Sequence, residues 1–133
     1  MPHFLDIFFV LFHTFLILFN LFGWIWKPTR IANLVTLLLT GGSWFILGLI
    51  VGTPGYCPLT DLHFKILGSL GKTMLPESYV KYLADRLTGL DFSTKLVDIA
   101  TLLAFCTALL VSLLVNTRDM LRRRRRLKSL NQA

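Results

Sequence analysis

The stretch IANLVTLLLTGGSWFILGLIVG, residues 31–52, decides the fold because it contains no charged side chain over 22 residues. A bilayer hydrocarbon core about 30 Å thick needs roughly 20 apolar residues of helix. Residues 4–26 interrupt their apolar run with one acid, Asp6, and residues 96–115 with one acid, Asp98. The sequence therefore predicts an all-α membrane protein with three transmembrane helices at these positions.

The composition of the whole chain agrees with a membrane protein. The 133 residues are 54% hydrophobic and only 16% charged, with a mean hydropathy of +0.64, whereas soluble domains are about 45–50% apolar and about 25% charged. The formal net charge of +7 is also uneven, because residues 116–133 carry +6 and residues 1–115 carry +1. This distribution argues against a soluble enzyme and against a nucleic-acid-binding domain.

The positions of the basic residues predict the orientation. Lys27 and Arg30 lie in the short turn after the first span, and the basic tail follows the third span. With three spans both features fall on one side, which the positive-inside rule makes cytoplasmic. We therefore expect the N-terminus outside, a bundle over residues 1–115 with an outer connector at 53–95, and a cytoplasmic tail at 116–133. A fourth span in the connector would separate the two basic features, so three spans are favoured.

The connector is expected to contain two outer helices. Thr60 is suited to cap a first helix that runs to about Gly68, with Pro58 stiffening the turn before it. Pro76 is suited to the first turn of a second, amphipathic helix that lies on the membrane surface or packs onto the bundle. Its expected apolar face contains Tyr79, Leu83, Leu87 and Leu90, and its charged face contains Glu77, Lys81 and Asp85.

Polar side chains recur at helical spacing inside the spans. Asp6, His13 and Asn20 are seven residues apart and form one stripe, which we expect to face the bundle interior. At about 1.5 Å per residue, His13 is predicted to share a layer near the membrane centre with Ser43 and Cys106. Two interpretations of His13 are open, a neutral ring bonded to a neighbouring hydroxyl and a ligand or proton-relay group.

Five residues are expected to lie near one another at the outer mouth of the bundle, where they would bring thiolate, imidazole and carboxylate groups to the same level. This set offers metal-ligand or redox chemistry, and the alternative is a structural turn made by Pro58 and Thr60. Haem with two histidine ligands is disfavoured because His13 is deep and His63 is outside, unless residues 61–71 enter the bilayer. The candidate residues are Cys57, Asp61, His63, Asp6 and Asp98.

The tail contains five consecutive arginines, Arg122, Arg123, Arg124, Arg125 and Arg126. Runs of this kind bind nucleic acid in other contexts. Directly after a membrane span, they are better explained as a topology determinant that binds anionic lipid headgroups. We therefore predict lipid as the partner of the tail and no nucleic acid.

Two motifs resemble a known family. The second span is followed by Gly-Tyr-Cys-Pro-Leu-Thr at 55–60, and Leu-Pro-Glu-Ser-Tyr-Val-Lys-Tyr-Leu follows at 75–83. Over about residues 10–115 the chain resembles a family of small bacterial membrane proteins defined as a domain of unknown function. Members typically follow the first motif with an acidic residue and an arginine, where this chain reads Asp-Leu-His-Phe-Lys at 61–65. The resemblance implies a bacterial inner membrane and a bundle of three or four helices, and it implies no activity.

The sequence contains no nucleophile with a matching base at a known motif spacing, so no catalytic residue and no cofactor is named. We predict a small non-enzymatic inner-membrane protein, an accessory or scaffold subunit that binds a protein partner or another copy of itself. The alternative is a redox, metal or haem protein that uses Cys57 and His63 at the mouth or His13 within the bundle. A proton-coupled transporter is the third possibility, and it would need more helices or an oligomer.

Overall fold

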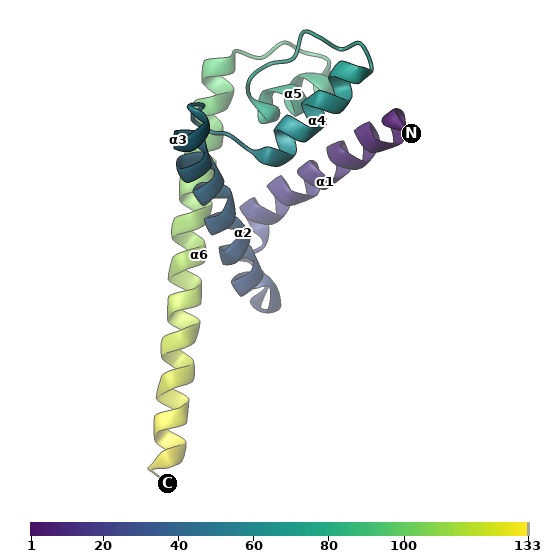
Figure 1. The fold of residues 1–133 in the computed structure, drawn as a ribbon. Coiled ribbons are helices and arrows are strands. Elements are labelled where there is room, and N and C mark those ends of the chain that lie inside the picture. The colour runs from purple at the N-terminus through teal and green to yellow at the C-terminus, as the bar shows by residue number, and fades with distance from the viewer. Residues whose placement is uncertain (133) are drawn as a thin grey trace.

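Three long apolar helices form the frame of the molecule (Figure 1). The structure is a computed structural model that describes residues 1–132, and every regular element in that range is helical. Three stretches are long and apolar enough to cross a membrane, namely Pro2–Phe22, Lys27–Val51 and Thr94–Asn131. The predicted all-α class is therefore confirmed. Each of the expected spans at 4–26, 31–52 and 96–115 overlaps one of these stretches, although residues 23–26 and 52 lie outside them.

The first helix, α1 (Pro2–Phe22), meets the second span at a tight turn and then diverges from it. The turn contains η1 (Lys27–Thr29), and α2 (Arg30–Gly42) follows at once. Figure 1 shows α1 and α2 meeting near the turn and separating toward their other ends, while α2 lies along α6 (Thr94–Asn131). The three spans are thus close together at one end and splayed at the other.

The second span changes its winding near the middle. After α2, a π-helical turn, η2 (Ser43–Leu47), leads into α3 (Gly48–Val51). The Ser43 hydroxyl donates to the Tyr56 carbonyl at 2.8 Å, and a Cβ at Gly48 would lie 3.0 Å from the Thr53 carbonyl oxygen. The wider turn and the missing side chain let the loop after α3 pack back against the span.

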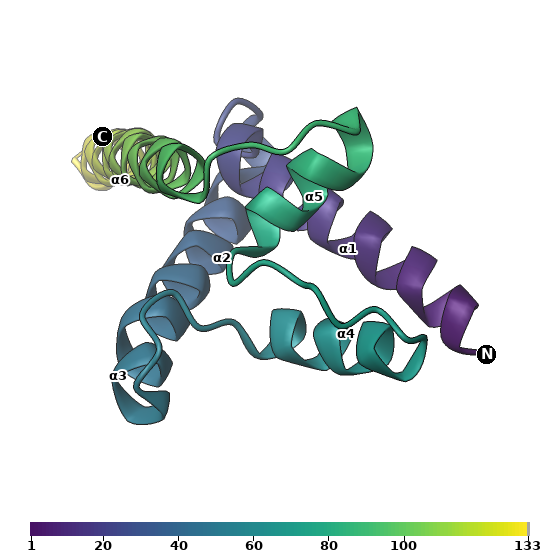
Figure 2. The same cartoon turned by 90° about the horizontal axis from the view of Figure 1, so that it is seen from above.

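Two short helices fill the splayed end of the molecule. They are α4 (Pro58–Ser69) and α5 (Tyr79–Thr88), and residues 58–88 are called the cap below. Figure 2, seen from above, shows the cap helices beside α1, with α5 on the side nearer α6. Contacts join α4 to α1 and α5 to α6. The expected amphipathic second helix therefore packs onto the protein.

The starts of both cap helices differ from the predictions. The first helix begins at Pro58 with Cys57 before it, so Thr60 lies in the first turn and is not the cap. Proline suits this position because its fixed φ is already helical and a first-turn N–H has no intrahelical partner. The second helix begins at Tyr79, because the Ser78 hydroxyl accepts the Lys81 N–H and caps it. Pro76 therefore lies in the preceding loop.

Burial on α5 also corrects the expected face. Tyr79 and Leu83 are buried, whereas Leu87 and Leu90 are exposed. The predicted ion pair between Lys81 and Asp85 is present, with the ammonium 2.5 Å from the carboxylate. The buried apolar face of this helix is thus shorter than its sequence suggested. Leu90 lies beyond the end of the helix at Thr88, and Leu87 lies in its last turn and faces outward.

Polar contacts join the second span to the turn before it and to the third span. The Arg30 guanidinium donates to the Trp24 carbonyl at 3.0 Å and pairs with Asp119 at 2.7 Å. The Asn116 amide donates to the Arg30 carbonyl at 3.1 Å. These bonds place Asp119 of α6 at the level of the turn after α1.

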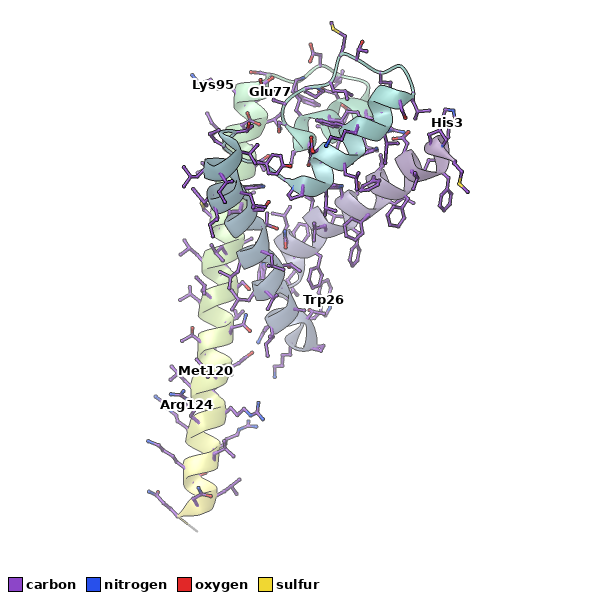
Figure 3. The ribbon with its side chains drawn as sticks, viewed as in Figure 1. His3, Trp26, Glu77, Lys95, Met120 and Arg124 are labelled. Atoms are coloured by element: carbon purple, nitrogen blue, oxygen red, sulfur yellow. The ribbon has the colours of Figure 1, made fainter. Side chains whose placement is uncertain are left out.

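The last helix continues past this level without a break. No glycine or proline interrupts α6 between Thr94 and Asn131, so the basic tail is helical through Asn131. Figure 3 shows α6 continuing beyond the other elements at Arg124. The tail is therefore a straight continuation of the third span.

Candidate functional site

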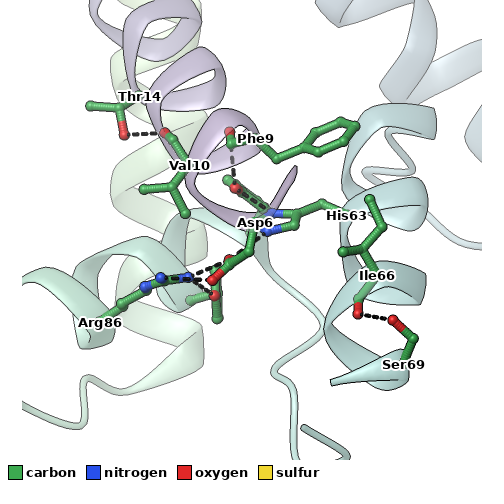
Figure 4. Close-up of polar contacts among 10 residues, drawn as sticks. Asp6, Phe9, Val10, Thr14, His63, Ile66, Ser69 and Arg86 are labelled. Carbon is green, nitrogen blue, oxygen red and sulfur yellow. Dashed lines mark hydrogen bonds and ion pairs between the residues drawn. The ribbon is translucent and has the colours of Figure 1, made fainter. Parts of the chain in front are cut away.

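The candidate site is a buried ionic network between α1 and the cap. Asp6, in the second turn of α1, is 6% exposed. The Arg86 guanidinium of α5 donates to both carboxylate oxygens of Asp6, at 2.7 Å and 3.0 Å. Figure 4 shows Arg86 and His63 approaching Asp6 from different sides. A paired carboxylate and guanidinium of this geometry satisfies the charge that burial would otherwise penalise.

His63 of α4 is the centre of the network and is fully buried. Its Nε2 lies 3.0 Å from the Asp6 carboxylate, and its Nδ1 lies 2.8 Å from the Tyr79 hydroxyl. Because an ionised carboxylate only accepts, the neutral ring carries its proton on Nε2 and accepts the Tyr79 hydroxyl proton on Nδ1. Burial lowers the pKa of His63, against the hydrogen bond to Asp6, which raises it.

Aromatic rings enclose the imidazole. The Phe9 ring of α1 stacks on His63 with centroids 5.2 Å apart, and the Tyr82 ring meets it edge-on at 5.9 Å. Tyr82 also accepts a hydrogen bond from Arg86 through its hydroxyl, and burial raises the pKa of both Tyr79 and Tyr82. The imidazole is therefore shielded from water, which strengthens the electrostatic interactions that it makes.

His13 lies beside this network without joining its hydrogen bonds. Its ring is 4.0 Å from the Tyr79 ring, centroid to centroid, and neither of its nitrogens has a hydrogen-bond partner. His13 does not meet Ser43 or Cys106, with which it is predicted to share a layer, because Ser43 bonds to Tyr56 and Cys106 is exposed. Equal depth does not bring these residues together because α1 diverges from α2 and α6 (Figure 1).

The predicted outer-mouth set comes together only in part. Asp6 and His63 meet, but Asp61 pairs with Lys65 at 2.9 Å on the outside of α4. Asp98 is exposed, and Cys57 has a free thiol. Over residues 1–132, no group of three or more His, Cys, Asp or Glu side chains is placed to hold a metal ion. Residues 61 and 63 are two apart on a helix, so they point in different directions.

Asn20, the third member of the polar stripe, and Asn33 of α2 join the first two spans to one another. The Asn20 amide donates to the Thr40 hydroxyl at 3.0 Å. The Asn33 amide donates to the Phe19 and Asn20 carbonyls at 2.7 Å and 3.1 Å. The stripe of Asp6, His13 and Asn20 is thus buried throughout, but its first two members face the cap and only the third faces α2.

Arg86 was not identified from the sequence, and Tyr79 was assigned only to an apolar face. A signal for both was present, since Tyr79, Tyr82 and Arg86 follow the spacing i, i+3, i+7 on one face of a helix. A buried Asp6 also requires a cation. What was missing is the contact between α5 and α1, which are separated by more than fifty residues of chain.

The fold and the buried network define a helical protein with three membrane-length spans and a helical cap. The chain matches a family model over residues 3–117 and belongs to the family described as Protein of Unknown function (DUF2784). No curated protein and no solved structure matches the chain.

Proposed function

We propose that this protein is a non-enzymatic component of a membrane complex, an accessory or scaffold subunit, with its N-terminus outside and its C-terminus in the cytoplasm of a bacterial inner membrane. The observation that carries the proposal is that the polar side chains bond one helix of the protein to another. Asp6, Asn20 and Arg30 each tie one helix to another. The polar groups of this chain hold its shape.

The exposed apolar faces of the spans support the proposal that the chain binds a protein partner. Only 11% of the apolar stretch in Lys27–Val51 is buried by the rest of the protein, and 22% of the stretch in Pro2–Phe22. Leu49 and Ile50 of α3 are 84% and 75% exposed. A splayed bundle with such faces presents surface to lipid and to the helices of another membrane protein or of a second copy.

Crosslinking in the membrane tests this proposal. A photoreactive residue at Leu49 is expected to give one reproducible protein adduct, because this side chain points away from the bundle. The same residue at Leu37, which is fully buried, serves as the control and should give only the uncrosslinked chain. If the protein is a monomer in mild detergent and the residue at Leu49 crosslinks only to lipid, the proposal that the chain binds a protein partner is contradicted.

A second candidate function is ligand binding at His13. The observation in its favour is that both ring nitrogens are buried without partners, which is costly for a polar group. Absorption spectroscopy and elemental analysis of the same purified sample test it, because a stoichiometric chromophore or metal would favour this candidate over the first.

The orientation proposal includes anionic phospholipid at the tail. Arg30 and Asp119 mark the level of the turn on α6. At 1.5 Å per residue, Arg122 lies about 5 Å and Arg126 about 11 Å beyond it. The headgroup region is about 5–8 Å thick on each side, so the arginines lie within it and just beyond it.

Replacing Arg122–Arg126 by glutamine is expected to remove a preference for anionic lipid. In reconstituted membranes, the native chain should immobilise spin-labelled phosphatidylglycerol more than phosphatidylcholine, and added salt should weaken this preference. Replacing Lys65 and Lys72 of the cap by glutamine removes two positive charges far from the tail and serves as the control for position. An unchanged preference in the arginine variant would place the lipid contact elsewhere.

A further inference from the structure

The cap closes over a histidine that has no contact with solvent. His63 is fully buried, and its two ring nitrogens bond to groups from two other helices, Asp6 of α1 and Tyr79 of α5. One imidazole therefore joins α1, α4 and α5 at a single point. Any change in its protonation therefore acts on both hydrogen bonds at once.

The hydrogen bonds around His63 have a second arrangement available. In the neutral state the Tyr79 hydroxyl donates to Nδ1. If Nδ1 gains a proton, it becomes a donor to the Tyr79 oxygen, and the hydroxyl must donate to another acceptor. The Phe9 carbonyl oxygen lies 3.5 Å from that hydroxyl. The site can therefore take up a proton without losing a hydrogen bond.

The charge balance opposes this second arrangement. In the neutral state, one carboxylate, Asp6, faces one guanidinium, Arg86. A protonated His63 adds a second cation beside that single carboxylate. The titratable and charged groups around His63 are Asp6 and His13 on α1, Tyr79, Tyr82 and Arg86 on α5, and Lys72 in the loop between α4 and α5.

We propose that His63 is a proton-binding site, and that acidification on the side of the membrane that carries the cap loosens the cap from α1. This inference goes beyond the proposed structural role and holds whether or not a partner protein is found. The ligand of this site is a proton, and His63 binds it less readily when the cap is docked on α1 than when the cap is loosened. Loosening would uncover the Phe9 side of α1 and the buried cap residues.

The direction of the pH dependence follows from the environment of the ring. Burial lowers the pKa of His63 below its ordinary value of 6.5. The undocked state then binds the proton more readily than the docked state. Docking is therefore strongest above about pH 6.5 and weakens as the pH falls through the range below that value.

Cys57 supplies a reporter, because it directly precedes α4 and carries a free, half-buried thiol. The experiment uses the full chain in lipid nanodiscs with Cys106 replaced by serine. The rate of maleimide labelling at Cys57 is compared between this chain and the same chain carrying His63→Gln. Glutamine can donate and accept like a neutral imidazole but takes up no proton, so the ratio of the two rates removes the ordinary pH dependence of the thiol.

The ratio is expected to be near one above about pH 7 and to rise severalfold toward about pH 4.5, by at most about tenfold per pH unit. A His13→Gln variant should keep the rise, because His13 makes no hydrogen bond in the network. A ratio that stays flat would overturn the proposal.

Hydrogen exchange on the unmodified chain gives a second measurement, which does not depend on whether a variant folds. Protection factors of amides in α4 and α5 should fall below about pH 6.5, while those of α6 between 100 and 115 stay unchanged. Equal protection of the cap across this range would overturn the proposal by itself.

Discussion

Replacing Asp6 by alanine is expected to lower the free energy of unfolding by about 3 kcal/mol. The substitution removes the only carboxylate that Arg86 and His63 share, and it leaves a guanidinium and an imidazole without their partner. The Arg86 side chain is 31% exposed, so water relieves part of the cost, and the effect lies at the lower end of the range for a broken buried pair. Equilibrium unfolding in detergent micelles measures it.

Asp98 offers a matched control for this variant. It is also an acid near the start of a span helix, but it is exposed, and Asp98→Ala should change stability by less than about 0.5 kcal/mol. Combining Asp6→Ala with Arg86→Met should cost less than the two single changes together, since the second removes the unpaired cation. Additive effects, or an equal loss in the Asp98 variant, would show that the network contributes nothing specific.

The second large effect is expected at Leu67. This side chain of α4 is fully buried against Tyr79, Tyr82 and Leu83 of α5. Leu67→Ala leaves a cavity in the small core of the cap and should cost about 3 kcal/mol. This core joins α4 to α5 and also packs against Val10 and Ile17 of α1, but it does not join α1 to α2 or α6. Hydrogen exchange should therefore increase in the cap while α2 and α6 keep their protection.

Leu62 is the matched control for Leu67, because it is a leucine of the same helix that is 49% exposed. Leu62→Ala should leave both the stability and the exchange of the cap nearly unchanged. If the two leucine variants lose protection equally, α4 is not packed as the structure describes. If the Leu67 variant loosens α2 and α6 as well, the cap and the bundle form one cooperative unit.

Two simple quantities in the sequence, the length of the apolar runs and the spacing of the polar residues, predict the spans and the buried polar stripe of α1. The charge-free run at 31–52 needed no tertiary information, because a helix of that composition satisfies its backbone internally and buries its side chains in lipid. The same holds for the burial of Asp6, His13 and Asn20, since a polar residue in a span avoids the lipid face.

The partners of these residues were beyond sequence reasoning. Depth arithmetic grouped His13 with Ser43 and Cys106 on the assumption of parallel spans, but α1 diverges from α2 and the cap fills the space between (Figure 1). The outer-mouth set failed for a local reason, because Asp61 and His63 point to different sides of α4 and only His63 faces α1.

The sequence by itself determined that this chain is helical, that three of its segments are long and apolar enough to span a membrane, and that a stripe of α1 is polar. Only the tertiary structure decided what that stripe meets. Arg86, Tyr79 and His63 reach Asp6 because α5 and α4 pack on α1, and such contacts between distant segments depend on packing that no local pattern encodes. The helical periodicity is local and can be read from the chain, whereas the choice of neighbours is a property of the whole fold.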